Sequence, residues 1–126
     1  MDPIARLREL ALALSDRHGN FGADEVLPYA AEAIALVRSH PERLAEFEQE
    51  FVCLPGHAPP EFIEVCMHAL RLPGVRAAFE RERRAAIAAN DWRREPAFRH
   101  YLMAFEDDWE DAVDFYSEYF GKPNVR

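Results

Sequence analysis

The amino-acid sequence predicts an all-α protein, folded as a single-domain irregular helical bundle of about six or seven helices over residues 1–126. The good helix formers Ala, Leu, Glu and Arg dominate the composition. Thr does not occur, only 5 Gly are present, and the alternation of β-branched residues that is typical of strands is almost absent. A chain of 126 residues that is 49% hydrophobic and 30% charged has the balance of one globular domain.

The first two helices are predicted from their end signals. Asp2 followed by a proline favours a helix start, so the first helix is expected over roughly 3–18, with Gly19 ending it. The second helix is expected over roughly 24–39. Pro28 is predicted to lie in its first turn, because a proline deeper in a helix removes a needed N–H donor.

Three more helices are predicted in the middle of the chain. A capping-box pattern at 39–42 predicts that the third helix follows almost at once. The loop 54–60, rich in Pro and Gly, separates it from a fourth helix, which the Pro-Gly pair at 73–74 is expected to end. A fifth helix then covers 75–87, and Asn-Asp at 90–91 marks the next break.

The C-terminal third predicts two further helices. One begins near Glu95 and buries Phe98 and Tyr101, and the other runs from about Asp107 to Phe120. Neither Gly nor Pro separates them, which leaves open whether they form one bent helix. Nine of the 15 aromatic residues of the chain fall within residues 92–120.

The charge of the chain is strongly uneven. Its 15 basic and 23 acidic residues give a net charge of −8, and residues 106–118 alone hold seven acidic and no basic residues. Residues 71–99 carry eight basic and four acidic residues, and we expect these arginines to pair with acidic helices of the same chain. A field of this sign repels nucleic acids and anionic membranes and attracts basic proteins. The expected partner is therefore a basic protein, with no nucleic acid and no membrane involved.

The acidic stretch at 106–118 is the main candidate binding surface. Within a continuous helix, Asp107, Asp111, Asp114 and Glu118 follow i, i+4, i+7, i+11 spacing and would share one face. That face has three interpretations: a solvated surface, a contact surface for a basic partner, or a metal site. The residues predicted to bind a partner, by charge or as aromatic anchors, are Asp107, Asp108, Trp109, Glu110, Asp111, Asp114, Glu118 and Tyr119.

In size, composition and this acidic, aromatic C-terminal third, the whole chain resembles the small helical immunity proteins of bacterial toxin systems, such as contact-dependent growth inhibition and related polymorphic toxins. The resemblance implies tight binding to a cognate toxin domain, often a nuclease, in the cytoplasm of the producing cell. A nuclease holds phosphate in a basic groove, and a rigid row of carboxylates can occupy that groove.

Motifs for catalysis or for a cofactor are missing from the sequence. It contains no HExxH, no Cys/His zinc spacing, no glycine-rich phosphate loop and no serine in a nucleophile elbow. The sequence therefore predicts a protein that is not an enzyme and takes no cofactor or metal. Glu61 and Glu64, one helical turn apart, are interpreted as helix-surface carboxylates, and Cys53 and Cys66 as two buried free thiols of a cytoplasmic protein. Neither a secretory signal nor a membrane span is expected.

Two alternatives remain at this point. Residues 107–111 match the DDxxD spacing that holds magnesium and pyrophosphate in prenyl-transfer enzymes, so the chain could be a magnesium-dependent enzyme acting on a phosphorylated substrate. The other alternative is a helical scaffold or homodimer whose C-terminal aromatic residues pair across a two-fold axis.

Overall fold

The computed structural model describes residues 2–15 and 22–120, and within these residues it contains helices and no β-strand. This confirms the predicted all-α fold class. Six helices are long, two are short, and a 3₁₀ helix, η2, joins α2 to α3. Their bounds are α1 (Pro3–Leu12), α2 (Ala23–Ser39), η2 (Pro41–Arg43), α3 (Leu44–Val52), α4 (Pro60–Leu70), α5 (Pro73–Ala88), α6 (Arg94–Met103), α7 (Asp111–Asp114) and α8 (Ser117–Phe120).

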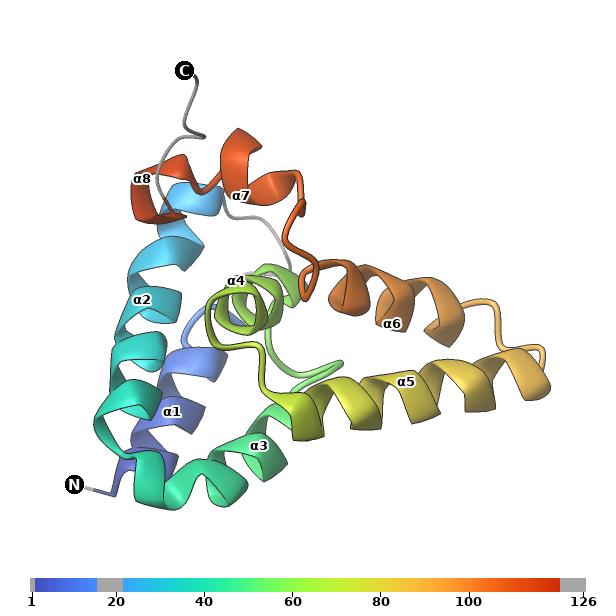
Figure 1. Cartoon of the computed structure of the whole chain (residues 1–126), viewed down its shortest axis with the longest axis horizontal. Helices are drawn as coiled ribbons and strands as arrows, with labels where there is room; N and C mark the ends of the chain where they lie inside the picture. Colours follow the sequence, from blue (N-terminus) through green and yellow to red (C-terminus); the bar gives the residue numbers. More distant parts are fainter. Residues whose placement is uncertain (1, 16–21, 121–126) are drawn as a thin grey trace.

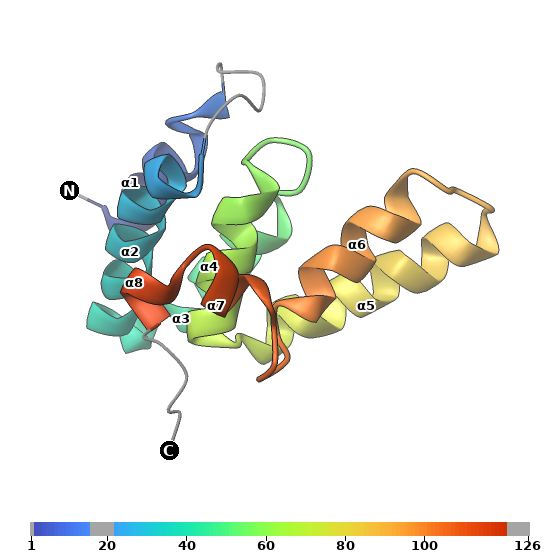
Figure 2. The same cartoon turned by 90° about the horizontal axis from the view of Figure 1, so that it is seen from above.

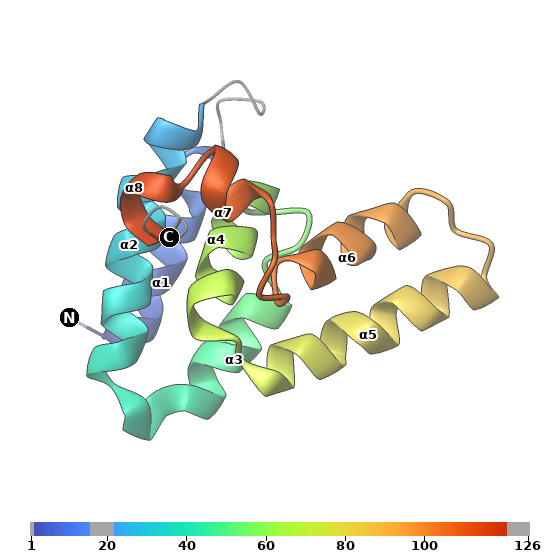
Figure 3. The same cartoon turned by 45° about the horizontal axis from the view of Figure 1, so that its top comes forward.

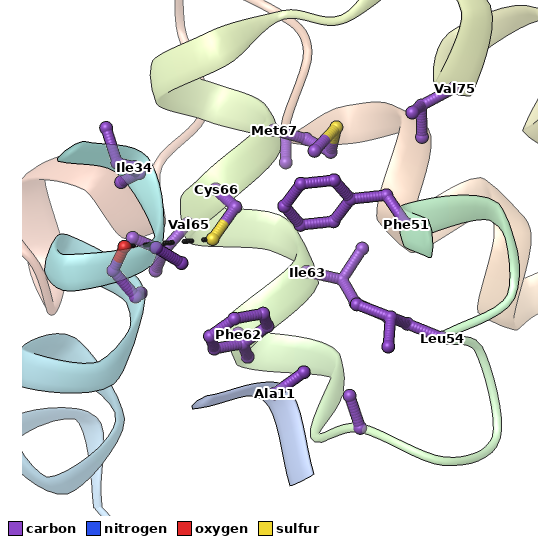
Figure 4. Close-up of a cluster of buried hydrophobic side chains, with 14 of the residues drawn as sticks. Ala11, Ile34, Phe51, Leu54, Phe62, Ile63, Val65, Cys66, Met67 and Val75 are labelled. Atoms are coloured by element: carbon purple, nitrogen blue, oxygen red, sulfur yellow. Dashed lines mark hydrogen bonds between the residues drawn. The ribbon is translucent and has the colours of Figure 1, made fainter. Parts of the chain in front are cut away.

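Helix α4 lies in the middle of the molecule, between the α1–α2 pair and the α5–α6 pair (Figure 1). Phe62, Ile63, Val65, Cys66 and Met67 of this helix are all buried. A helix that is apolar on nearly every side must be covered from several directions, and the side chains around α4 form the core of the protein (Figure 4). The thiol of Cys66 lies 3.9 Å from the carbonyl oxygen of Ala30 in α2. Cys53 is exposed just after the end of α3, so the expectation that both thiols are buried is wrong for this residue.

Helices α5 and α6 form a hairpin that extends away from the rest of the bundle (Figure 2). Its interior is aromatic: the ring of Phe79 lies 5.6 Å from that of Phe98 and 5.3 Å from that of Tyr101. Arg83 donates a hydrogen bond of 2.8 Å to the buried carboxylate of Glu95, which ties the two helices together near their connection. The hairpin is therefore held by an aromatic extension of the main core and by an ion pair.

Two expectations for the N-terminal helices are wrong. Helix α1 ends at Leu12 rather than near residue 18, and the predicted stop at Gly19 lies outside the described residues. Helix α2 begins at Ala23, which places Pro28 in the second turn. The helix tolerates this proline because Pro28 and Asp24, whose carbonyl loses its intrahelical donor, are both exposed, so water can bind the free carbonyl.

Two predicted helix ends are also corrected. The hydroxyl of Ser39 donates to the carbonyl of Ala35 at 2.8 Å, so the capping box predicted at 39–42 does not form. The Pro-Gly pair at 73–74 begins α5 instead of ending α4. Helix α4 ends earlier, where Arg71 adopts a left-handed conformation with φ of 51°.

The continuous C-terminal helix predicted from Asp107 to Phe120 does not form. Residues 104–110 are turns, and the short helices α7 and α8 follow with a break between them (Figure 3). Helices α6 and α7 are consequently separate, which answers the question of one bent helix. Seven acidic residues without a basic neighbour in sequence repel one another along a helix face, and burial of Trp109 and Tyr116 favours a folded-back path for the chain.

Candidate functional site

The acidic residues at 106–118 are neutralised only in part, by one arginine at the end of α4 and one in α5. Asp107 pairs with Arg71, and Glu106 lies 3.3 Å from Arg76. The Arg71 guanidinium, by hydrogen bonding to the Asp107 carboxyl, holds the pKa of that carboxyl below its ordinary value. These two ion pairs anchor the turn after α6 to the start of α5, and they leave the rest of the acidic stretch uncompensated.

Four carboxylates of this stretch are exposed and form no ion pair within the described residues. Because the continuous helix is absent, the predicted single row of Asp107, Asp111, Asp114 and Glu118 does not form. The four exposed carboxylates lie in the turn before α7 and within α7 and α8. These four residues, hereafter the acidic rim, are Asp108, Glu110, Asp114 and Glu118.

Trp109 and Tyr119 were predicted to be exposed aromatic anchors, but neither side chain is fully exposed. Trp109 is only 7% exposed, and its ring lies 5.0 Å from that of His68 and 5.8 Å from that of Tyr116. The prediction of Trp109 as an exposed anchor is therefore wrong. Tyr119 is partly buried against the core, beside Phe120. Phe115, which was not selected from the sequence, is the most exposed aromatic residue of the stretch at 64%.

Asp111, a member of the predicted set, lines a pocket together with residues of α4 and α6. The pocket has a volume of about 460 Å³ and opens between α4, α6 and α7, at the point where the α5–α6 hairpin leaves the bundle. A volume in the range of roughly 300–1,000 Å³ is typical of ligand sites. The lining residues are Ala23, Pro60, Glu61, Glu64, Ala97, His100, Tyr101, Asp111, Phe115 and Tyr116.

The pocket carries an excess of negative charge in a partly desolvated setting. Burial first, and then the nearby carboxylates of Glu61 and Asp111, together raise the pKa of Glu64 to about 8. Burial also raises the pKa of Asp111, with a contribution from Asp114, while His100 acts in the opposite direction. None of the ten described lining residues is Lys or Arg, so no permanent cation of that wall balances the carboxylates.

One carboxylate oxygen of the pocket is left without a partner. Oε1 of Glu61 is buried and accepts no hydrogen bond from the described residues. Buried acceptors are normally paired, because an unpaired one keeps the full cost of losing its water. The interpretation of Glu61 and Glu64 as ordinary helix-surface carboxylates is wrong, since both are partly buried and line the pocket.

Aromatic side chains supply the other walls. Tyr101 of α6 and Tyr116 between α7 and α8 are almost fully buried, and burial raises the pKa of both hydroxyls, further raised by Glu61 and Glu64. The exposed ring of Phe115 lies at the edge of the pocket. The combination of carboxylates, tyrosines and a phenylalanine suits a positively charged organic group better than an anion.

A divalent metal is less well served by these residues. Within residues 2–15 and 22–120, no group of three or more His, Cys, Asp or Glu side chains is arranged to hold a metal ion. The DDxxD stretch 107–111 runs through the turn at 107–110 into the first residue of α7, and its first carboxylate pairs with Arg71. The magnesium-dependent enzyme stays a prediction. The homodimer that pairs through the C-terminal aromatic residues stays a prediction as well.

The geometry defines an all-α protein with an acidic pocket and an acidic rim beside it. No protein-family model, curated protein or solved structure matches the chain. In the described part of the chain, no helix combines the length and the apolar character that crossing a membrane requires.

Proposed function

We propose that this chain is a non-catalytic bacterial immunity protein, which binds and neutralises a basic toxin domain, a nuclease, in the cytoplasm of the producing cell. Its contact surface consists of the acidic rim, Asp111 and the exposed ring of Phe115. The observation that carries the proposal is the exposed acidic rim, whose carboxylates have no ion-pair partner among the described residues.

Electrostatics support this choice of partner. A net charge of −8, with seven acidic and no basic residues at 106–118, produces a negative potential that attracts a basic surface and repels phosphate backbones. Oppositely charged partners associate faster, because their encounters are steered. An uncompensated rim costs folding free energy by self-repulsion, and a basic partner recovers that cost on binding.

Apolar side chains within the same surface support a tight contact. Phe115 and Val113 are exposed at 64% and 48%, and both lie among the acidic residues. Binding energy at protein interfaces concentrates in a few large side chains that lose water completely, surrounded by polar residues that exclude solvent. Phe115 takes the anchoring role that the sequence analysis assigned to Trp109.

Inhibition follows from competition for one groove. A nuclease needs a basic groove to hold the phosphate backbone. A protein that presents carboxylates on a folded framework can fill that groove without being cleaved, so nucleic acid is excluded for as long as the complex lasts. No chemistry by the inhibitor is required.

The test uses the product of the gene adjacent to the one for this chain, because an immunity gene normally lies beside its toxin gene. The two purified proteins are expected to form a complex whose association rate falls about tenfold or more from low to high salt. Replacing Asp111 and Asp114 by Lys is expected to slow association, whereas Glu42→Gln on the distant η2 helix should not. Absence of a complex, or an association rate unchanged by the double reversal, overturns the proposal.

A further inference from the structure

The pocket between α4, α6 and α7 has features that a surface contact alone does not explain. Three carboxylates converge on it from two separate elements: Glu61 and Glu64 from α4, and Asp111 from α7. Assembling like charges in a partly buried place is unfavourable unless something of opposite charge enters. The buried, unpaired oxygen of Glu61 points to a missing hydrogen-bond donor at the same place.

The side chains that line the pocket favour one kind of cation, a planar organic one. Aromatic rings of Tyr101, Phe115 and Tyr116 line the pocket beside the carboxylates. A planar guanidinium stacks on aromatic faces and also donates up to five hydrogen bonds in a fixed plane. The carboxylates are not grouped so that a single metal ion could be held by the described residues, but a flat group with several separated donors can reach carboxylates that lie apart.

We propose that this pocket binds a guanidinium group, and that an arginine side chain of the basic partner supplies it. The methylene stem of the arginine then lies along Phe115 at the pocket mouth, and the guanidinium donates to Glu61 and to the carboxylates beside it. A volume of about 460 Å³ accommodates one long side chain, not a folded segment. That a partner protein supplies the arginine rests on the proposed function. That the pocket binds a guanidinium group does not rest on it.

The binding of a cation is coupled to a proton. Burial, together with the carboxylates of Glu61 and Asp111, holds the Glu64 pKa at about 8, so at neutral pH this carboxyl is mostly protonated in the free protein. The other titratable groups that line the pocket are His100, Tyr101 and Tyr116. A guanidinium favours the ionised form and lowers the pKa, which releases a proton on binding. Affinity for the cation therefore rises with pH between about pH 6 and pH 9.

The experiment titrates the ¹⁵N-labelled full chain with N-acetyl-arginine methylamide and records amide shifts. Shifts are expected at Tyr101, Asp111 and Tyr116, and the affinity should exceed that for the citrulline analogue, a neutral group of the same shape, by about fivefold or more. Glu64→Gln should weaken binding by about fivefold or more at pH 9, and Asp111→Asn similarly, whereas Glu42→Gln leaves it unchanged. Equal binding of arginine and citrulline, or no shifts at these residues, overturns the inference.

Further measurements distinguish a free molecule from a partner side chain as the source of the guanidinium. They also distinguish failure of this inference from failure of the proposed function. Propylguanidine carries the same guanidinium and methylene stem on a free molecule without a second charge, and binding about tenfold tighter than the capped arginine would overturn the assignment to a partner side chain. If the capped arginine fails to bind while the toxin complex forms, this inference is wrong and the proposed function stands. If arginine binds in the pocket and the neighbouring product does not bind, the proposed function is wrong instead.

Discussion

Trp109 stacks on Tyr116, with ring centroids 5.8 Å apart and an interplanar angle of 20°. The contact joins the turn after α6 to the segment between α7 and α8, so it fixes the path of the acidic stretch. Because Tyr116 also lines the pocket, the same stack holds one pocket wall in place. Trp109 therefore supports the binding surface from beneath and does not itself form part of it.

Replacing Trp109 by Ala is expected to lower the free energy of unfolding by about 3–5 kcal/mol, because it removes the ring contacts with His68 and Tyr116 and leaves a cavity. Urea unfolding followed by circular dichroism measures this change. Trp109→Phe, which keeps an aromatic ring, should lose clearly less stability. A loss below about 1 kcal/mol for the alanine variant would show that the stack does not hold the C-terminal segment.

Glu64→Gln is expected to stabilise the protein at neutral and alkaline pH. The folded-state pKa of about 8 lies above the ordinary value of 4.5, so between these values the folded protein holds a proton that the unfolded chain releases. The unfolding free energy of the wild type therefore falls as pH rises through that window, and glutamine removes this fall. Thermal unfolding from pH 4 to pH 9 measures the difference, which should disappear below about pH 4.5.

The matched control for this experiment is Glu42→Gln, since Glu42 is exposed on η2. Its unfolding curve should follow that of the wild type at every pH. A Glu64→Gln variant whose stability also runs parallel to the wild type from pH 4 to pH 9 would mean that Glu64 ionises like an ordinary surface carboxyl.

The α5–α6 hairpin should depend on its ion pair. Arg83 donates to Glu95, whose side chain is 10% exposed, so removing the arginine leaves a buried carboxylate whose remaining ion-pair partner among the described residues is Arg99, at 3.8 Å. Arg83→Met is expected to cost about 1–3 kcal/mol and to speed amide hydrogen exchange in α6. Arg81→Met on the exposed side of α5 is the control. Equal exchange rates in the two variants would contradict the role of the pair.

Phe115→Ala is expected to weaken binding of the basic partner by about tenfold or more, with little loss of stability because the ring is largely exposed. Trp92→Ala removes another exposed aromatic residue, 69% exposed at the far end of the hairpin, and should leave affinity unchanged. Surface plasmon resonance with the neighbouring gene product compares the two variants. Equal losses from both would place the contact elsewhere on the molecule.

The helices that could be predicted are those whose periodicity and end residues agree. The break at 90–91 was placed correctly, where Asp91 accepts hydrogen bonds from the backbone N–H groups of Arg93 and Arg94 at 3.2 Å. The prediction of a continuous helix over 107–120 was wrong because the helical spacing competes with charge repulsion and with burial of Trp109. That burial depends on His68, which belongs to a helix distant in sequence. Spacing along a chain does not report such contacts.

The pocket could not be found from spacing, because its walls come from four separate parts of the chain. One indication was available: Glu64 stands between Ile63 and Val65 in a helix that is apolar on nearly every side. A helix of that kind is covered all round, so its one interior glutamate must be partly buried. Asp111 and Tyr116 face Glu64 only because the C-terminal segment folds back, and the sequence does not predict that path.

The most direct test of the account is the pKa of Glu64, measured by ¹³C NMR of its side-chain carboxyl with and without saturating N-acetyl-arginine methylamide. We predict a pKa near 8 for Glu64 in the free protein and a clear fall when the guanidinium is bound. A pKa near 4.5 in the free protein, or the same value in both samples, would contradict it.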